Sequence, residues 1–147
     1  MSLEASYSTD IEVPRTQLVS FQGNIKESPC MKILKSAMEK VIKYRGGKFD
    51  TSYTDNKGKP TNCILSVRTN DFPRGVGAII EPDGKVTFRY ESYGDYKGIG
   101  KSICNEINQN YNVIAVMRAQ KRLGFNVDVS ERQSKFGQKV VTVTGVR

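Results

Sequence analysis

Hydrophobic and polar positions along the first third of the chain predict a strand and then a helix. Between residues 19 and 25, apolar or small side chains alternate with polar ones, as in a half-buried strand. Across residues 30–42 the apolar side chains recur at helical spacing instead. Ser28 is suited to cap this helix, Pro29 suits its first turn, and the glycines at 46–47 end it.

The middle of the chain predicts antiparallel hairpins. Turn sequences at 55–58 and 82–84 combine Asp or Asn with Gly, which accept the backbone angles of tight turns. The segments around them alternate apolar with polar side chains, so each offers one face to a core. The predicted strands are residues 49–54, 61–69, 76–80 and 85–90.

A second helical region spans about residues 99–123, with Gly124 as the residue that follows its end. Its apolar stripe changes face around residues 108–112, where helix propensity is poor, so a kink or a re-capped second helix is expected there. Apolar positions at 125–129 and 140–143, around a turn at residues 135–137, predict a closing hairpin.

The predicted fold is a single α+β domain over residues 18–147, preceded by an arm. Residues 1–17 are polar and slightly acidic without a sustained apolar period, so we expect an arm that is loose or laid over the domain. The order of elements is β-α-β-β-β-β-α-β-β. It predicts an antiparallel or mixed sheet with two helices on one face. A chain of 147 residues suffices for one modest core.

The charge balance points to an anionic partner. The chain carries 23 Lys and Arg against 15 Asp and Glu, which gives a net charge of +8. The first 25 residues hold one of the basic and three of the acidic side chains, so the excess belongs to the domain and not to a basic tail. Such an excess bears on partners and solubility rather than on fold.

Several kinds of chemistry are disfavoured by what the sequence lacks. There is no His, so the usual general base and the commonest metal ligand are absent. The three cysteines are too far apart for paired zinc knuckles or a disulfide scaffold, and we interpret them as reduced, buried thiols. No apolar run suits a membrane helix and the start is no signal peptide. We expect a soluble, cytoplasmic protein, or one of another reducing compartment, with no metal, no cofactor and no membrane partner.

Two stretches resemble a known family. Residues 20–41 and 107–129 are similar to the hypothetical chloroplast reading frame thirty-five family, small proteins of cyanobacteria, red-algal plastids and some of their viruses. The sharpest points of the resemblance are Gln109, Tyr111, Val116 and the Gly124-Phe125 step. The chain departs from the family by its N-terminal arm, its basic balance and the absence of an aromatic-rich segment around Gly94. The family has no established activity, so the resemblance implies a fold and a reducing compartment only.

Tyrosines alternate with basic residues across positions 89–97, a pattern that suits single-stranded nucleic acid. Tyrosine rings stack on unpaired bases while Lys and Arg follow the phosphates. In the alternative interpretation, Tyr90 belongs to the core while Tyr93 and Tyr96 cover the entrance of the helix. A second basic patch lies in the second helix, and whether the two patches form one groove or scatter as solubilising charges is left open. The candidate nucleic-acid-binding residues are Arg89, Tyr93, Tyr96, Lys97, Lys101, Arg118, Lys121 and Arg122.

The GIGKS sequence at residues 98–102 is similar to the end of a phosphate-binding loop. However, Asp95 stands where the first glycine of that motif belongs, and a carboxylate opposes phosphate. The βαβ alternation of such nucleotide-binding proteins is also missing. No pair of carboxylates has a spacing that indicates acid–base catalysis, so no catalytic residue is predicted.

Three functional hypotheses follow. The leading one is a non-enzymatic binding module with a basic surface for single-stranded nucleic acid or another polyanion. The second is a protein–protein accessory or assembly component that uses an exposed sheet edge or the shifted face of the second helix. The third is a nucleotide-binding protein with a degenerate phosphate loop.

Overall fold

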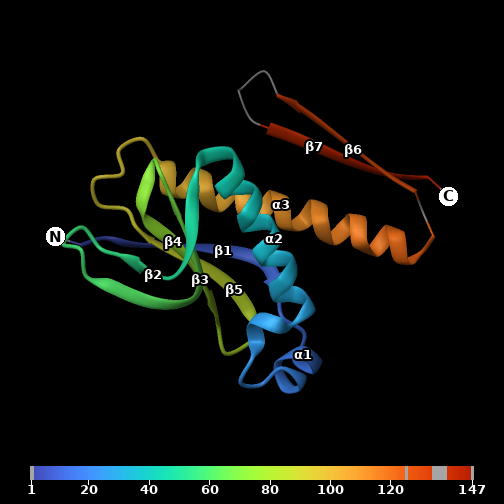
Figure 1. Ribbon diagram of the computed structural model, residues 1–147, viewed down its shortest axis with the longest axis horizontal. Coiled ribbons are helices and arrows are strands. Elements are labelled where there is room, and N and C mark those ends of the chain that lie inside the picture. The colour runs from blue at the N-terminus through green and yellow to red at the C-terminus, as the bar shows by residue number, and fades with distance from the viewer. Residues whose placement is uncertain (1, 125, 134–138, 147) are drawn as a thin grey trace.

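The computed structural model describes residues 2–124, 126–133 and 139–146. Their α+β fold combines one five-stranded antiparallel sheet, of order β1-β5-β4-β3-β2, with two long helices and a separate two-stranded sheet (Figure 1). The elements are β1 (Glu4–Glu12), α1 (Arg15–Ser20), the short 3-10 helix η1 (Ile25–Glu27), α2 (Pro29–Arg45), β2 (Gly47–Thr54), β3 (Pro60–Thr69), β4 (Phe72–Ile80), β5 (Lys85–Glu91), α3 (Ile99–Arg122), β6 (Asn126–Gln133) and β7 (Lys139–Val146).

The N-terminal segment is part of the sheet, so the prediction of a separate arm was wrong. Residues 4–12 form the edge strand β1, which pairs antiparallel with β5. Its inward positions include Ala5, Tyr7 and Thr9, which are too weakly hydrophobic to give a clear apolar period in the sequence. The buried carboxylate of Glu91 anchors the start of the strand, because it accepts hydrogen bonds from the Leu3 amide at 3.0 Å and from the hydroxyl of Ser2 at 2.8 Å.

The predicted strand over residues 19–25 was also wrong. This segment contains the end of α1, a turn and the start of η1. β1 already holds the sheet edge beside β5, and Val19, an apolar residue of the predicted strand, is exposed. The α1 region instead contacts the start of α2, where the side-chain oxygen of Gln17 accepts a hydrogen bond from the Cys30 amide at 3.1 Å.

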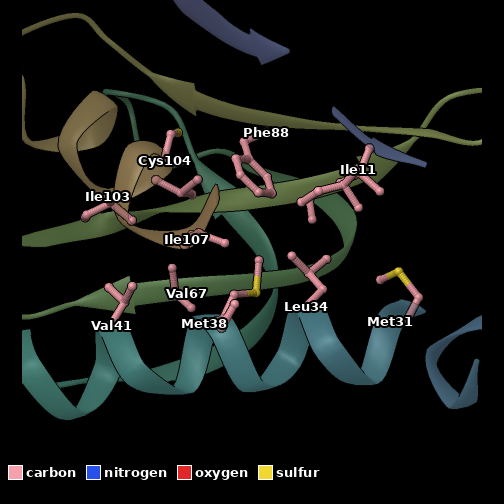
Figure 2. Packing of buried hydrophobic residues seen from close by; sticks show 14 of the residues in the cluster. Ile11, Met31, Leu34, Met38, Val41, Val67, Phe88, Ile103, Cys104 and Ile107 are labelled. Carbon is pink, nitrogen blue, oxygen red and sulfur yellow. The ribbon is translucent and has the colours of Figure 1, made fainter. Parts of the chain in front are cut away.

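The predicted cap residues of helix α2, Ser28 at its start and Gly46 at its end, are confirmed. The hydroxyl of Ser28 accepts a hydrogen bond from the Met31 amide at 3.3 Å, and Pro29 occupies the first turn. The helix ends at Gly46, whose φ of +77° favours glycine. On the buried face, Leu34 and Met38 point from α2 toward the sheet and α3 (Figure 2).

The four predicted central strands are confirmed, with ends that differ by a few residues. Each strand turns alternate side chains toward the helices, so that Val67 pairs with Val76, and Ala78 with Phe88, on that face of the sheet. Together with Ile103 and Ile107 of α3 they form one core between the sheet and the two helices (Figure 2).

A side chain near the end of β2 packs on the sheet face opposite the helices. Tyr53 is buried although it does not face the helices. A Cβ atom on Gly77 of β4 would come within 2.6 Å of its ring, so only glycine leaves room for this side chain. Burial, together with the nearby carboxylate of Glu4, raises the pKa of Tyr53 to about 12. The predicted helix-free face is therefore partly covered by the chain itself.

Helix α3 runs without a break from Ile99 to Arg122, so the expected new cap at residues 108–112 does not occur. The polar side chains in this stretch contact α2. The amide of Asn110 donates to the Ala37 carbonyl at 3.1 Å, and the Tyr111 hydroxyl lies 3.1 Å from the sulfur of Cys30. These tertiary contacts compensate for the poor helix propensity. Burial raises the pKa of the Cys30 thiol, and all three cysteines are free.

The last turns of α3 project beyond α2, and the hairpin of β6 and β7 contacts α3 (Figure 1). The two strands pair antiparallel, which confirms the predicted closing hairpin, and Val129 lies opposite Val143. They form a sheet of their own and add no strand to the main sheet. The predicted turn at residues 135–137 lies outside the described residues.

The described residues contain neither a helix suited to span a membrane nor a cluster of metal-binding side chains. None of the helices combines the length and the apolar character that crossing a membrane requires. Within the same residues, no group of three or more Cys, Asp or Glu side chains is arranged to hold a metal ion.

Candidate nucleic-acid interface

The eight predicted binding residues lie in three separate places. Arg89 is in the middle of β5. Tyr93, Tyr96 and Lys97 are in the loop before α3, with Lys101 in its first turn, whereas the other three are in its last turns. At 1.5 Å per residue, Lys101 and Arg118 are about 25 Å apart along the helix axis. The predicted residues therefore do not line a single groove.

Arg89 is held by carboxylates. Its side chain lies on the face of β5 opposite the buried Phe88, where it is 3.2 Å from a carboxylate oxygen of Glu81 and 3.7 Å from one of Glu4. Glu4 is the first residue of the neighbouring strand β1, and Glu81 directly follows the neighbouring strand β4. The alternation of β5 could have placed Arg89 on this face, but not its two partners. Arg89 is therefore better explained as a structural ion pair than as a ligand contact.

The loop before α3 exposes one tyrosine almost completely. Tyr96 has 94% of its surface exposed, so it does not pack over the entrance of the helix, whereas Tyr93 is 40% exposed. Tyr90, by contrast, belongs to the core as expected, with its ring 6.0 Å from that of Phe72. Backbone hydrogen bonds shape the loop, and Gly98 adopts a φ of +67° just before the helix. Tyr96 is thus exposed on a turn that backbone hydrogen bonds define.

Asp95 occupies the position that the phosphate-loop hypothesis assigns to a phosphate. Its two carboxylate oxygens accept hydrogen bonds from the amides of Ile99 and Gly100, both at 2.9 Å. These amides form the positive end of α3, and they are already satisfied. Gly100 serves close packing, because a Cβ there would lie 2.5 Å from the Tyr90 ring. The geometry therefore gives little support to nucleotide binding through this loop.

Arg74, which the sequence interpretation missed, faces the same loop. It lies near the start of β4, and one guanidinium nitrogen donates to the carbonyl of Tyr93. Because β4 and β5 are antiparallel, the start of β4 adjoins the end of β5 and the loop that follows. The hairpin of β4 and β5 was predicted from the sequence. Arg74 could therefore have been identified as a basic residue that this hairpin places beside the loop after β5.

Two adjoining hollows open at this end of the sheet, on either side of Pro73. The one beside the loop has a volume of about 320 Å³, and it is lined by parts of β4 and of the loop. The other has a volume of about 680 Å³, and it is lined by parts of β2, β3 and the turn between β3 and β4. Pro73 lines both hollows. We call the two linings together the Pro73 surface and define it by Lys48, Arg68, Pro73, Arg74, Tyr96 and Lys97.

The aspartates at this surface all have partners within the protein. Asp50 accepts from the guanidinium of Arg68 at 2.8 Å, and Asp71 from the hydroxyl of Thr69 at 2.7 Å. Asp71 also pairs with Arg45, which links α2 to the turn between β3 and β4. With Asp95 bound to the start of α3, none of these carboxylates depends on a Lys or Arg of the loop for a counter-charge.

The pKa values of two of these carboxyl groups are lowered. For Asp50 the main cause is its hydrogen bond from the Thr51 amide, followed by the one from Arg68. For Asp71, burial acts to raise the pKa, but the Thr69 hydroxyl and the Arg45 guanidinium outweigh it. Both groups are therefore ionised at neutral pH, with their charge directed to internal donors.

Three cations of the Pro73 surface form no ion pair among the described residues, although the charge of Lys48 contributes to lowering the pKa of Asp50. In the described part of the chain, Lys48, Arg74 and Lys97 form no ion pair. Arg68 is already paired with Asp50. Four Lys or Arg and three Asp side chains line the two hollows, so the lining has a net charge of +1. Its three cations without an ion pair come from β2, β4 and the loop before α3.

Basic residues in the last turns of α3 have different surroundings. Arg118, Lys121 and Arg122 are exposed, and we call them the α3 terminus. Cations here interact favourably with the negative end of the helix dipole. Two apolar side chains nearby are also exposed, Val116 by 43% and Leu123 by 64%. Neither hollow of the Pro73 surface extends to this region.

Comparison with known proteins gives no match to a protein family, a curated protein or a solved structure. The resemblance to the hypothetical chloroplast reading frame thirty-five family stays a prediction.

Proposed function

We propose that the protein is a non-enzymatic module that binds single-stranded nucleic acid at the Pro73 surface. The observation that carries the proposal is a set of three cations without ion pairs in two adjoining hollows. Arg74 and Lys97 line the same hollow as the exposed Tyr96, and Lys48 lines the other. The aspartates among them are bound to internal donors, so the surface has cationic groups free for an anionic ligand.

The arrangement has the two components that single-strand binding requires. Cations along a path neutralise phosphates and release counterions, whereas an aromatic ring stacks on a base. The cations alone would attract duplex and single strand alike. Tyr96 adds a preference for the single strand, because its ring can stack only on a base whose face is free. No acid–base pair is required for this function.

The proposal is tested by the salt dependence of binding. Fluorescence anisotropy is measured with a labelled oligothymidylate and with a duplex of the same length. With three phosphates neutralised, the logarithm of the association constant should fall against the logarithm of salt concentration with a slope of about −2. The single strand should bind more tightly than the duplex. No binding at low salt, where electrostatic attraction is strongest, would contradict the proposal.

A further inference from the structure

The hollow beside the loop differs from a simple cationic patch because part of its lining is apolar. Phe72, Pro73 and Ile99 contribute to it, and they come from the start of β4 and the start of α3. Arg74, Tyr96 and Lys97 line the same hollow. Its volume of about 320 Å³ lies at the lower end of the range for small-molecule sites.

The side chains around this hollow leave it open. Tyr96 is almost fully exposed, so its ring is not packed into the hollow. The guanidinium of Arg74 donates to the carbonyl of Tyr93. The carboxylates of Asp71 and Asp95 also line the hollow, and both are bound to internal donors. What remains is an apolar lining with an aromatic ring and two cations beside it.

We infer that this hollow seats one unpaired base of the bound strand. The base ring lies against Pro73 and Tyr96, and the phosphate attached to its nucleoside lies by Arg74 and Lys97. The inference rests on the proposed function and adds the recognition of a base to the attraction of phosphates. A polyanion without rings, such as polyphosphate, would leave the apolar lining in contact with water.

An abasic oligomer separates the base from the phosphates. It has the same phosphate backbone and length as the oligothymidylate but carries no bases. Stacking on one aromatic side chain is worth about tenfold in affinity. The wild-type protein should therefore bind the abasic strand about tenfold more weakly than the oligothymidylate at the same salt concentration.

Substitution of Tyr96 completes the test. Tyr96→Ala should lower the affinity for the oligothymidylate about tenfold. Its affinity for the abasic strand should equal that of the wild type, because that strand has no base to stack on Tyr96. Tyr44→Ala is the matched control, since Tyr44 is 84% exposed on α2 and lines neither hollow. Its affinity for both strands should equal that of the wild type.

The outcomes distinguish this inference from the proposed function. If the wild-type protein binds the abasic strand and the oligothymidylate with equal affinity, the inference that the hollow holds a base is wrong. Binding of nucleic acid through its phosphates would still stand. If Tyr96→Ala weakens the binding of both strands equally, the ring contacts the backbone of the strand, and the inference that the hollow holds a base is again wrong. If neither strand binds at low salt, both proposals fail. Thermal unfolding of each variant confirms that these exposed substitutions leave the fold intact.

Discussion

The Pro73 surface and the α3 terminus both carry three cations without ion pairs among the described residues, yet their surroundings differ. At the Pro73 surface, Lys48, Arg74 and Lys97 line two hollows, beside the exposed Tyr96 and carboxylates that are bound internally. At the α3 terminus the cations lie on successive turns of one helix, where its dipole accounts for them. Charge alone therefore does not identify a binding site, and the neighbouring groups decide.

The α3 terminus supports a different hypothesis. Val116 and Leu123 are apolar and exposed, and the adjoining hairpin of β6 and β7 forms a sheet separate from the main one. Exposed apolar side chains on a projecting element are typical of protein contacts. The alternative function as a protein–protein accessory is thus best placed here, away from the Pro73 surface.

The largest difference in stability is expected between substitution of Arg45, which pairs with Asp71 beside the Pro73 surface, and substitution of Arg118 at the α3 terminus. Arg45 pairs with Asp71 and Glu106, so Arg45→Met leaves two carboxylates unpaired beside the Pro73 surface. We expect it to lower the free energy of unfolding by about 2–3 kcal/mol. Arg118→Met removes an exposed side chain and should cost at most about 0.5 kcal/mol. Urea denaturation measures both, and equal losses would show that the Arg45 pairs do not stabilise the fold.

Glycines at the two ends of α3 give the next comparison. Gly100→Ala places a methyl group against the Tyr90 ring and should cost about 2 kcal/mol. Gly124 has a φ of +83° and nothing near its missing Cβ, so Gly124→Ala should cost about 1 kcal/mol from backbone strain alone. Thermal unfolding followed by circular dichroism ranks the two variants. The reverse order would mean that the start of α3 is packed less closely than the structure indicates.

Acid should destabilise the two regions differently. The folded pKa of Asp71 lies below its ordinary value of 3.8, so its stabilising contribution is complete above that pH and is lost as pH falls through the folded value. The free energy of unfolding of Asp71→Asn should therefore fall less steeply than that of wild type between about pH 5 and pH 2.

The control for this acid dependence is Arg122→Gln. The sequence has no carboxylate between residues 107 and 127, so this variant should follow the wild-type pH curve with at most a constant offset. Calorimetric unfolding at a series of pH values gives the three curves. Parallel curves for Asp71→Asn and wild type would show that Asp71 is not stabilised in the folded state.

The smallest effect is expected from the exposed apolar residues of α3. A Val116→Ser/Leu123→Ser variant should change the free energy of unfolding by at most about 0.5 kcal/mol and leave oligothymidylate affinity within about twofold. Light scattering records the mass of both proteins. A lower mass for the variant would show that copies associate through this region, and a large loss of affinity would contradict the separation of the two regions.

Local signals predicted the parts of the fold that depend on short stretches of chain. The cap at Ser28, the stop at Gly46 and the turn at residues 82–84 follow from the conformations that these residues favour. β1 could not be predicted in this way. Its inward side chains acquire their apolar environment only by pairing with β5, and its anchor, the buried Glu91, lies far away in the sequence.

Only the part of the candidate site that lies in one short stretch of chain could be predicted from the sequence. Tyr96 and Lys97 lie in one short loop, so their proximity was visible in the sequence. Arg74 joins them through the pairing of β4 with β5, and Lys48 through Pro73, which lines both hollows. Arg89 is close to the loop in sequence but points away from the core into an ion pair across the sheet.

The central claim is that the position of the cations matters more than their number. Two triple variants test it, Lys48→Glu/Arg74→Glu/Lys97→Glu at the Pro73 surface and Arg118→Glu/Lys121→Glu/Arg122→Glu at the α3 terminus. They have the same net charge, so long-range attraction is reduced equally. Oligothymidylate affinity is measured by fluorescence anisotropy at one low salt concentration, with thermal unfolding as the check that both variants fold. Oligothymidylate affinity should fall at least about a hundredfold in the Pro73 variant and less than about tenfold in the α3 variant. Equal losses of affinity, or a larger loss in the α3 variant, would contradict the account.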